Sequence, residues 1–281
     1  MRTILIPVDL TTTSENAVDY AVEWSQRYNY ERIILLKSFY DSMFEGIALS
    51  EGFMHVNAYM MDHERENALQ QLNDWCRIIA GKLPGIKIMT AVSEFPLLRA
   101  IMEVIKTETP ELIVIGSDNY SYSANSFVSV NLVSIAKASP VRLLVVPAHY
   151  RYQPVKEALV PCDLDTVTLL DKVNLLRNNP YWQDVHLQIL NVDTKEHIHW
   201  PAVALQEREK RLHEYLSSFN YVIHHERAND VLSGIRQYLQ QHEVQLIIAL
   251  PGSHSFLYQL THNSISEAIY RNAKQPVLIL K

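Results

Sequence analysis

Thr3-Ile-Leu-Ile-Pro-Val-Asp9 opens the chain, and Ala158-Leu-Val-Pro-Cys-Asp163 repeats its pattern in the second half. Each stretch is a short apolar run that ends in Pro-x-Asp, which is typical of a buried parallel strand running into a turn. The hydroxyl residues 11–14 suit a helix N-cap and precede apolar residues at helical spacing. Residues 166–176 are predicted to form the matching helix after the second copy.

The same alternation of strand and helix continues through each half of the chain. Further strands are predicted at 33–39, 86–92, 112–115 and 141–146, with helices at 60–80, 96–106 and 127–137. In the second half the strands are predicted at 186–192, 221–225, 245–250 and 276–280, with helices at 202–219, 231–241 and 264–273. Such alternation implies parallel crossovers, so we predict an α/β fold of two tandem, doubly wound, five-stranded parallel sheets covered on both faces.

Composition agrees with two soluble domains, which we place at 1–149 and 154–281. The 281 residues are 48% hydrophobic and 20% charged, with a net charge of −6, and neither half is basic. We therefore expect no nucleic-acid partner, because nucleic-acid binding depends on Lys and Arg at phosphates. No apolar run is long enough to span a bilayer and the N-terminus does not resemble a signal peptide, so we expect no membrane association and a cytoplasmic location.

The longest connection, residues 40–59, separates the second strand from the next helix. It is rich in Ser, Met, Phe and Glu, and so long a connection is usually functional or mobile. Its apolar side chains could pack as a lid on their own domain, or they could cover a small molecule or a partner.

Asp9 and Asp163 mark the expected binding crevices, because ligands of doubly wound sheets bind beyond the carboxyl ends of the strands where the strand order reverses. Either carboxylate could accept hydrogen bonds from a ligand or could cap the following helix. The seven glycines form neither GxGxxG nor GxxxxGK[ST], so neither glycine-rich phosphate motif is present.

The chain resembles the universal stress protein family, as a tandem member, over nearly its whole length. The resemblance is carried by Ile4-Leu-Ile-Pro-Val-Asp9 with its Ser/Thr-led helix, by Leu112-Ile-Val-Ile-Gly116 and by Pro276-Val-Leu-Ile-Leu280. It implies Rossmann-like domains of the adenine nucleotide alpha hydrolase-like kind. It also implies a pseudo-dimer inside one chain through the last strands, 141–146 and 277–280, with further homo-oligomers open.

Members of this family that bind ATP carry three spaced glycines and a hydroxyl residue after the fourth strand, and this chain departs from that pattern. In the first half the four positions fall on Gly116, Asn119, Ser129 and Val130. In the second half they fall on Leu250, Ser253, Asn263 and Ser264. Since only Gly116 and Ser264 match, the resemblance implies the branch of the family without ATP binding, and we expect no cofactor. A weaker adenine or anion site at these residues stays open.

The histidines suggest no metal site or catalytic machinery. The pairs His197/His199 and His224/His225 lack neighbouring metal ligands, and adjacent histidines in a strand point to opposite faces. His254 and His262 could bind an anion when protonated, or His254 could cap a helix and His262 could be exposed. We expect a non-enzymatic, stress-response binding or adaptor protein with an unknown protein partner, the alternatives being a nucleotide-binding switch or weak ATPase and a small-molecule carrier with 40–59 as lid.

Overall fold

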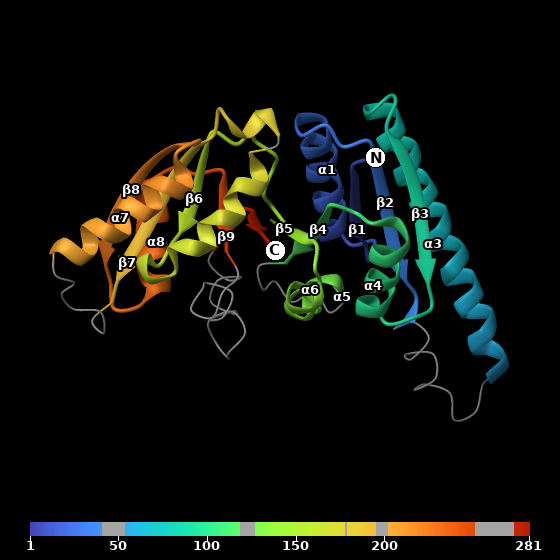
Figure 1. Ribbon diagram of the computed structural model, residues 1–281. Helices are drawn as coiled ribbons and strands as arrows, with labels where there is room; N and C mark the ends of the chain where they lie inside the picture. Colours follow the sequence, from blue (N-terminus) through green and yellow to red (C-terminus); the bar gives the residue numbers. More distant parts are fainter. Residues whose placement is uncertain (41–53, 119–126, 178, 195–201, 251–272) are drawn as a thin grey trace. The chain divides into compact units, whose positions relative to one another are not determined.

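The structure is a computed structural model of the 281-residue chain, and it describes residues 1–40, 54–118, 127–177, 179–194, 202–250 and 273–281 (Figure 1). The chain divides into two compact units, Met1–Val141 and Arg142–Lys281. The division falls before the last strand that the sequence assigned to domain 1–149, so the stretch after Pro147 lies inside the second unit.

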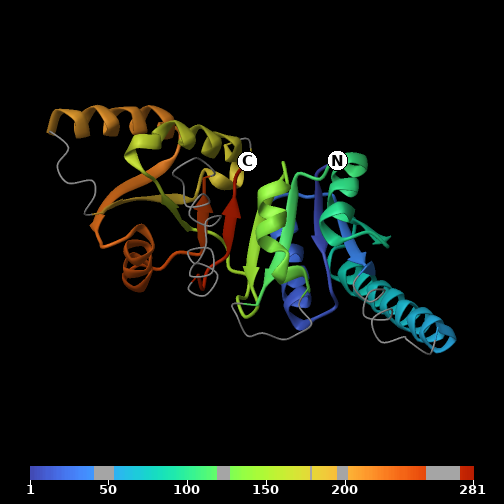
Figure 2. The same cartoon turned by 90° about the horizontal axis from the view of Figure 1, so that it is seen from below.

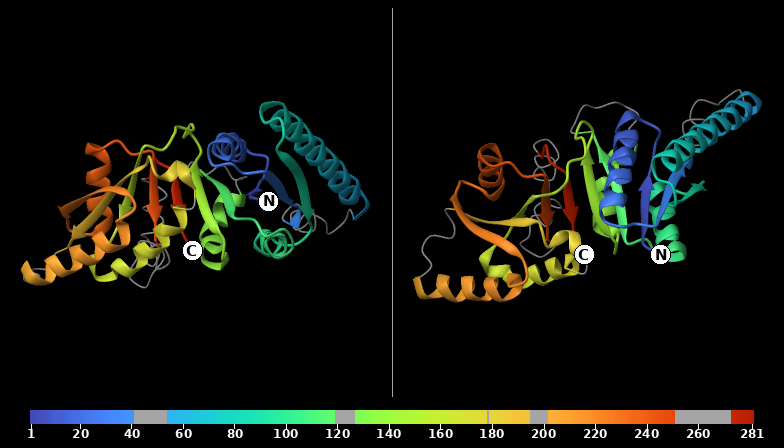
Figure 3. Two further views of the ribbon diagram at one scale, coloured as in Figure 1. Left: turned by 45° about the horizontal axis from the view of Figure 1, so that its top comes forward. Right: turned by 90° about the horizontal axis from the view of Figure 1, so that it is seen from above.

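The first unit alternates strands and helices as predicted. Its elements are β1 (Thr3–Pro7), α1 (Thr12–Arg27), β2 (Arg32–Ser38), α3 (Met54–Lys82), β3 (Lys87–Ser93), α4 (Leu97–Glu108), β4 (Leu112–Ser117), α5 (Phe127–Val130) and α6 (Leu132–Ala138). The strands stand in the order β3-β2-β1-β4, and β1 with β2, β1 with β4 and β2 with β3 pair in parallel. Figure 3 shows α1 and α3 on one face of this sheet and α4 and α6 on the other. This is the predicted mixed α/β fold with a mostly parallel sheet.

Burial follows position in the sheet. Every residue of β1 and β4 is buried, as expected for central parallel strands. The edge strand β3 is covered less than the central strands, because its residues are exposed or half-buried and Val92 is 41% exposed. The predicted helix 127–137 is also interrupted, since α5 ends at Val130 and α6 begins at Leu132.

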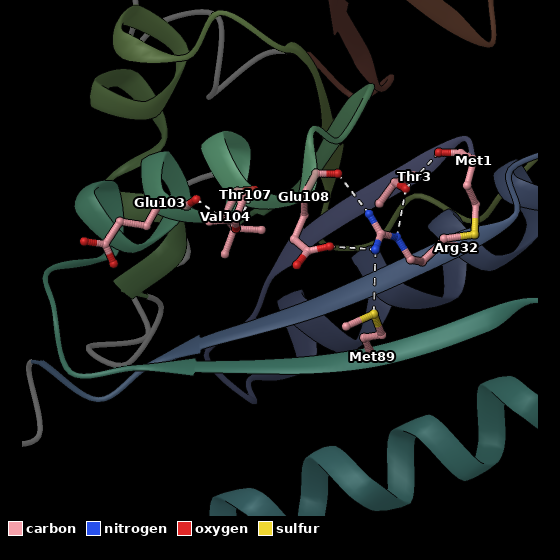
Figure 4. Close-up of polar contacts among 8 residues, drawn as sticks. All are labelled: Met1, Thr3, Arg32, Met89, Glu103, Val104, Thr107 and Glu108. Carbon is pink, nitrogen blue, oxygen red and sulfur yellow. Dashed lines mark hydrogen bonds and ion pairs between the residues drawn. The ribbon is translucent and has the colours of Figure 1, made fainter.

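Arg32, the first residue of β2, joins the amino-terminal edge of the sheet to the end of α4 (Figure 4). Its Nη1 lies 2.6 Å from Glu108 Oε2, its Nη2 donates to the Glu108 carbonyl at 2.9 Å, and its Nε donates to Thr3 Oγ1 at 3.0 Å. Only 11% of the Arg32 side chain is exposed. The planar guanidinium therefore places several donors at once in a site with little solvent.

The second unit begins with β5, the strand that was predicted to end the first domain. Its elements are β5 (Arg142–Pro147), β6 (Glu157–Pro161), η1 (Leu164–Leu176), η2 (Pro180–Trp182), β7 (His186–Asp193), α7 (Ala202–Leu216), β8 (Asn220–Arg227), α8 (Val231–Gln241), β9 (Leu246–Ala249) and β10 (Val277–Ile279). The strand order is β5-β10-β9-β6-β7-β8. β5 runs antiparallel to β10, and the other pairs are parallel.

Helices cover both faces of this sheet as well. Figure 2 shows η1 and α7 together on one face and α8 on the other. α8 begins in a capping box, in which Asp230 accepts from the Ser233 N–H at 2.9 Å and Ser233 Oγ accepts from the Asp230 N–H at 3.3 Å. The predicted helix 264–273 lies almost entirely outside the described residues.

The segment predicted as an α-helix at 166–176 is 3-10 helical over Leu164–Leu176. Its sequence is LDTVTLLDKVNLL, in which Asp, Thr, Val and Asn outnumber good helix formers. These residue types lose side-chain freedom in an α-helix or compete for its backbone hydrogen bonds, which weakens the α-helix relative to a tighter turn.

Candidate functional site

The candidate site of the first unit lies where β1 and β4 pair side by side. β1 pairs with β2 on one side and with β4 on the other, so the strand order reverses between β1 and β4. Asp9 follows β1, and Asp118 follows β4. The sequence therefore placed Asp9 correctly at the carboxyl edge where ligands of this fold class bind.

The Asp9 carboxylate is tied to the start of α1. Its Oδ1 accepts from the Thr11 hydroxyl at 2.6 Å, from the Thr11 backbone N–H at 3.3 Å and from the Ser14 hydroxyl. Thr11, and not Asp9, is the N-cap of α1, because its side chain accepts from the Ser14 N–H. Asp9 thus supports the cap from two positions before the cap residue.

The second oxygen of Asp9 reaches a distant part of the chain. Oδ2 accepts from the backbone N–H of Val128, in α5, at 3.1 Å. Beside it, Ser129 Oγ accepts from the backbone N–H of Asp118 at 3.1 Å. The backbone N–H groups of Val128 and Asp118 are therefore already bonded to side chains of the protein.

Gly116 has a packing role. A Cβ atom at this position would lie 2.6 Å from the Thr13 carbonyl oxygen and 2.9 Å from Thr13 Cγ2. Thr13 is 7% exposed and belongs to the first turn of α1. The glycine thus lets α1 approach β4 closely, which is one of the reasons for glycine inside a strand.

The structure brings three of the predicted site residues together in the first unit. Asp9 accepts from the Val128 N–H, Ser129 accepts from the Asp118 N–H, and Gly116 packs against Thr13 in the first turn of α1. Four predicted residues lie outside the described part of the chain: Asn119, Ser253, Asn263 and Ser264. The sequence missed the backbone N–H of Val128, which no side-chain pattern could reveal.

In the second unit Asp163 follows β6, which pairs with β7 and β9. Its neighbour Cys162 is 7% exposed, and burial together with the charge of Asp163 raises the pKa of the Cys162 thiol to about 12. The raised pKa favours the neutral thiol at physiological pH, which is the opposite of what activates a cysteine nucleophile.

The proposed lid, 40–59, is only partly within the described residues. Met54–Tyr59 is not loop, because α3 begins at Met54, earlier than the predicted residue 60. Residues 41–53 lie outside the part that the structure describes.

Metal ligands do not gather in the described residues, which hold no group of three His, Cys, Asp or Glu side chains suited to a metal ion. His224 and His225 point to opposite faces of β8, as predicted, since His224 contacts Gln188 of β7 and His225 contacts Glu209 of α7. His197, His199, His254 and His262 lie outside the described residues. No helix within the described residues has the length and apolar character needed to cross a membrane.

Comparison with known proteins agrees with this architecture. A structure of a universal stress protein from Archaeoglobus fulgidus DSM 4304 is similar to this chain with a TM-score of 0.63 at 16% identity, covering 99% of this chain and 98% of that one. A functionally unknown protein from Pseudomonas aeruginosa PAO1 gives a TM-score of 0.56 at 12% identity, covering 100% and 92%. These likenesses concern the fold. No curated protein matches the chain.

The sequence model of the universal stress protein family matches residues 1–147, which contain Asp9, Gly116 and Ser129. The match covers more than half of the 281 residues. This chain belongs to the universal stress protein family.

Proposed function

We propose that this protein is a non-enzymatic binding or adaptor protein of the stress response that does not bind ATP strongly. The observation that carries the proposal is the hydrogen bond from the Val128 N–H to Asp9 Oδ2, which uses the carboxylate at the mouth of the family's crevice to hold the protein's own backbone. Thr11 and Ser14 occupy the other oxygen.

A nucleotide that used Asp9 would have to displace one of these donors. A hydrogen bond to a charged group contributes about 1.5–3 kcal/mol, so its loss would weaken binding roughly tenfold to a hundredfold. The Asp118 N–H would in addition have to exchange Ser129 Oγ for a phosphate oxygen. These costs act together with the departure of Ser129 and Val130 from the glycine and hydroxyl residues of the ATP-binding pattern.

The proposal extends to assembly and location. Pairing of β5 with β10, Leu144 opposite Leu278, supports a pseudo-dimer through the last strands of the two predicted domains. Size-exclusion chromatography with light scattering should give a mass near 32.4 kDa if this pairing within the chain completes the assembly, and a multiple of that mass if the chain forms the further homo-oligomer that the resemblance leaves open. Free Cys76 and Cys162 support a reducing, cytoplasmic compartment.

The central test measures nucleotide binding directly. Freshly purified protein is denatured and the released nucleotides are quantified, and unfolding midpoints are measured with and without millimolar MgATP. We expect substoichiometric nucleotide and no shift for the native chain. The double variant Ser129→Gly/Val130→Ser, which restores two positions of the ATP-binding pattern, should gain an MgATP-dependent shift.

The control is Val92→Ser, an exposed valine on β3 away from the crevice, which should gain no shift. A large MgATP shift in the native chain that disappears in Asp9→Ala, each compared with its own nucleotide-free sample, would establish the nucleotide-binding alternative. A shift produced by another small molecule would favour the carrier.

A further inference from the structure

Histidines are distributed unevenly between the two units. Of the twelve histidines, all but His55 and His63 lie at or after His149. Within the second unit one group packs on the face of the sheet that α8 covers. We call it the histidine cluster, and it consists of Glu157, His186, Gln188, His224, Tyr238 and His242.

Gln188, on β7, links the cluster together. Its Oε1 accepts from His224 Nε2 at 2.7 Å and from the Tyr238 hydroxyl at 3.1 Å. Its Nε2 donates to Glu157 Oε2 at 2.5 Å, and the same carboxylate oxygen lies 3.0 Å from His186 Nδ1. Because Oε1 can only accept, His224 supplies an N–H from Nε2 to this bond.

Ring contacts fasten α8 to the same group. The Tyr238 and His242 rings stack with centroids 4.0 Å apart and planes 9° apart. His224 meets the edge of Tyr238 at 5.1 Å and lies 5.6 Å from His242. Tyr238 is 1% exposed, so these side chains add polar and ring contacts to the backbone pairing of β8 with β7 and to the apolar residues that α8 buries.

The surroundings of His224 disfavour its charged form. Burial lowers the pKa of His224, and His242 on the end of α8, His186 on β7 and His225 on β8 lower it further, against an opposing contribution from Glu226. Glu157 on β6 lies 3.0 Å from His186 Nδ1. The cluster partner of His224 is instead the neutral amide of Gln188.

We propose that the histidine cluster is an acid-sensitive latch, which holds α8 and the edge strand β8 on β7 while His224 is neutral and loosens them when His224 is protonated. A protonated His224 would face the histidines of two neighbouring elements, with Glu226 of its own strand as the opposing charge. Loosening of α8 would then expose the apolar side chains that it buries, Leu232 and Ile235 among them. A fall in pH would thus change the surface that this binding protein presents to a partner.

The sign follows from proton linkage. A released histidine has a pKa near 6.5, and the latched His224 has a lower one, so the released form binds more protons below pH 6.5. The stabilisation is complete above about pH 6.5 and is lost as the pH falls toward the pKa of the latched form. One such site at pH 5.5 can favour release by at most about tenfold relative to neutral pH.

The test is hydrogen exchange of the full-length protein, read by mass spectrometry as protection factors at pH 7.5, 6.5 and 5.5. Protection of residues 220–227 and 231–242 should fall several-fold, up to about tenfold, between the extremes, while β1 and β4 change little. His224→Gln, which stays uncharged and keeps a side-chain N–H, should flatten this dependence.

His225→Gln is the matched control, because His225 is adjacent but contacts Glu209 on the opposite face. It should keep the pH dependence of α8. The latch is overturned if protection of 231–242 in the native chain is independent of pH, or if His225→Gln removes the dependence and His224→Gln does not. Should His224→Gln not fold, the imidazole titration of His224 by NMR in the native chain decides, and a midpoint at or above 6.5 refutes the proposal.

Discussion

Replacement of Gly116 by alanine tests how closely α1 lies against β4. The new Cβ would stand 2.6 Å from the carbonyl oxygen of Thr13, well inside the closest approach of real atoms. That oxygen belongs to the backbone of the first turn of α1, so it cannot turn aside as a flexible side chain could. Either α1 or β4 must shift, and the Asp9 and Ser14 contacts shift with them.

The magnitude follows from overpacking of a close-packed interior. An added methyl group that forces backbone movement costs about 1–3 kcal/mol, which corresponds to roughly a 5-fold to 100-fold increase in opening of this region. Gly81 is the matched control, because its added Cβ would meet nothing within 4 Å and it lies in α3. Gly81→Ala should stabilise α3 by up to about 1 kcal/mol.

Native-state hydrogen exchange measures both effects in one protein, with β6 and β9 of the second unit as internal reference. Gly116→Ala should lower protection across β1, α1 and β4, and Gly81→Ala should leave these elements unchanged. Equal protection in Gly116→Ala and the native chain would refute the close approach. A loss of the same size in Gly81→Ala would show that the effect belongs to glycine substitution in general.

Two further predictions concern groups held in little solvent. Glu108→Gln leaves the guanidinium of Arg32 with a neutral partner in place of its carboxylate and should cost about 1–3 kcal/mol of unfolding free energy in urea. The comparison is the neutral variant Arg32→Met, which removes the charge as well. This prediction is contradicted if Glu108→Gln lowers the unfolding free energy less than the same substitution does in an exposed pair such as Arg99 with Glu103. Cys162 should resist alkylation by iodoacetamide at pH 8 in the folded protein and react at once in denaturant, because burial raises its pKa to about 12.

Most strands were predictable because central strands carry their signal in composition. The runs at 3–9 and 112–115 are continuous and apolar, and the structure buries every residue of β1 and β4. The edge strand β8 was predicted less well. Residues 220–227 alternate exposed and half-buried, and the predicted strand 221–225 was too short because its flanks are polar.

The position of the candidate site was predictable, but its bonding was not. Asp9 could be placed at a switch point because, in the commonest strand orders of doubly wound sheets, the reversal involves the first strand. The same carboxylate could have served a ligand or a helix cap, and it supports the cap and binds Val128. Every residue except proline supplies a backbone N–H, so contact between Asp9 and Val128 arises from the tertiary fold alone.

The contacts of the histidines were also not predictable from the sequence. Strand alternation correctly placed His224 and His225 on opposite faces. No sequence pattern indicated that His224 would contact Gln188 or Tyr238. Glu157 and His186 are the first residues of β6 and β7, so the cluster begins at the amino ends of the strands. Ligand crevices of this fold class are expected at the carboxyl ends, where Asp9 lies in the first unit. The histidine cluster at the amino ends is therefore separate from the family's nucleotide site. The latch can respond to pH whether or not any nucleotide binds.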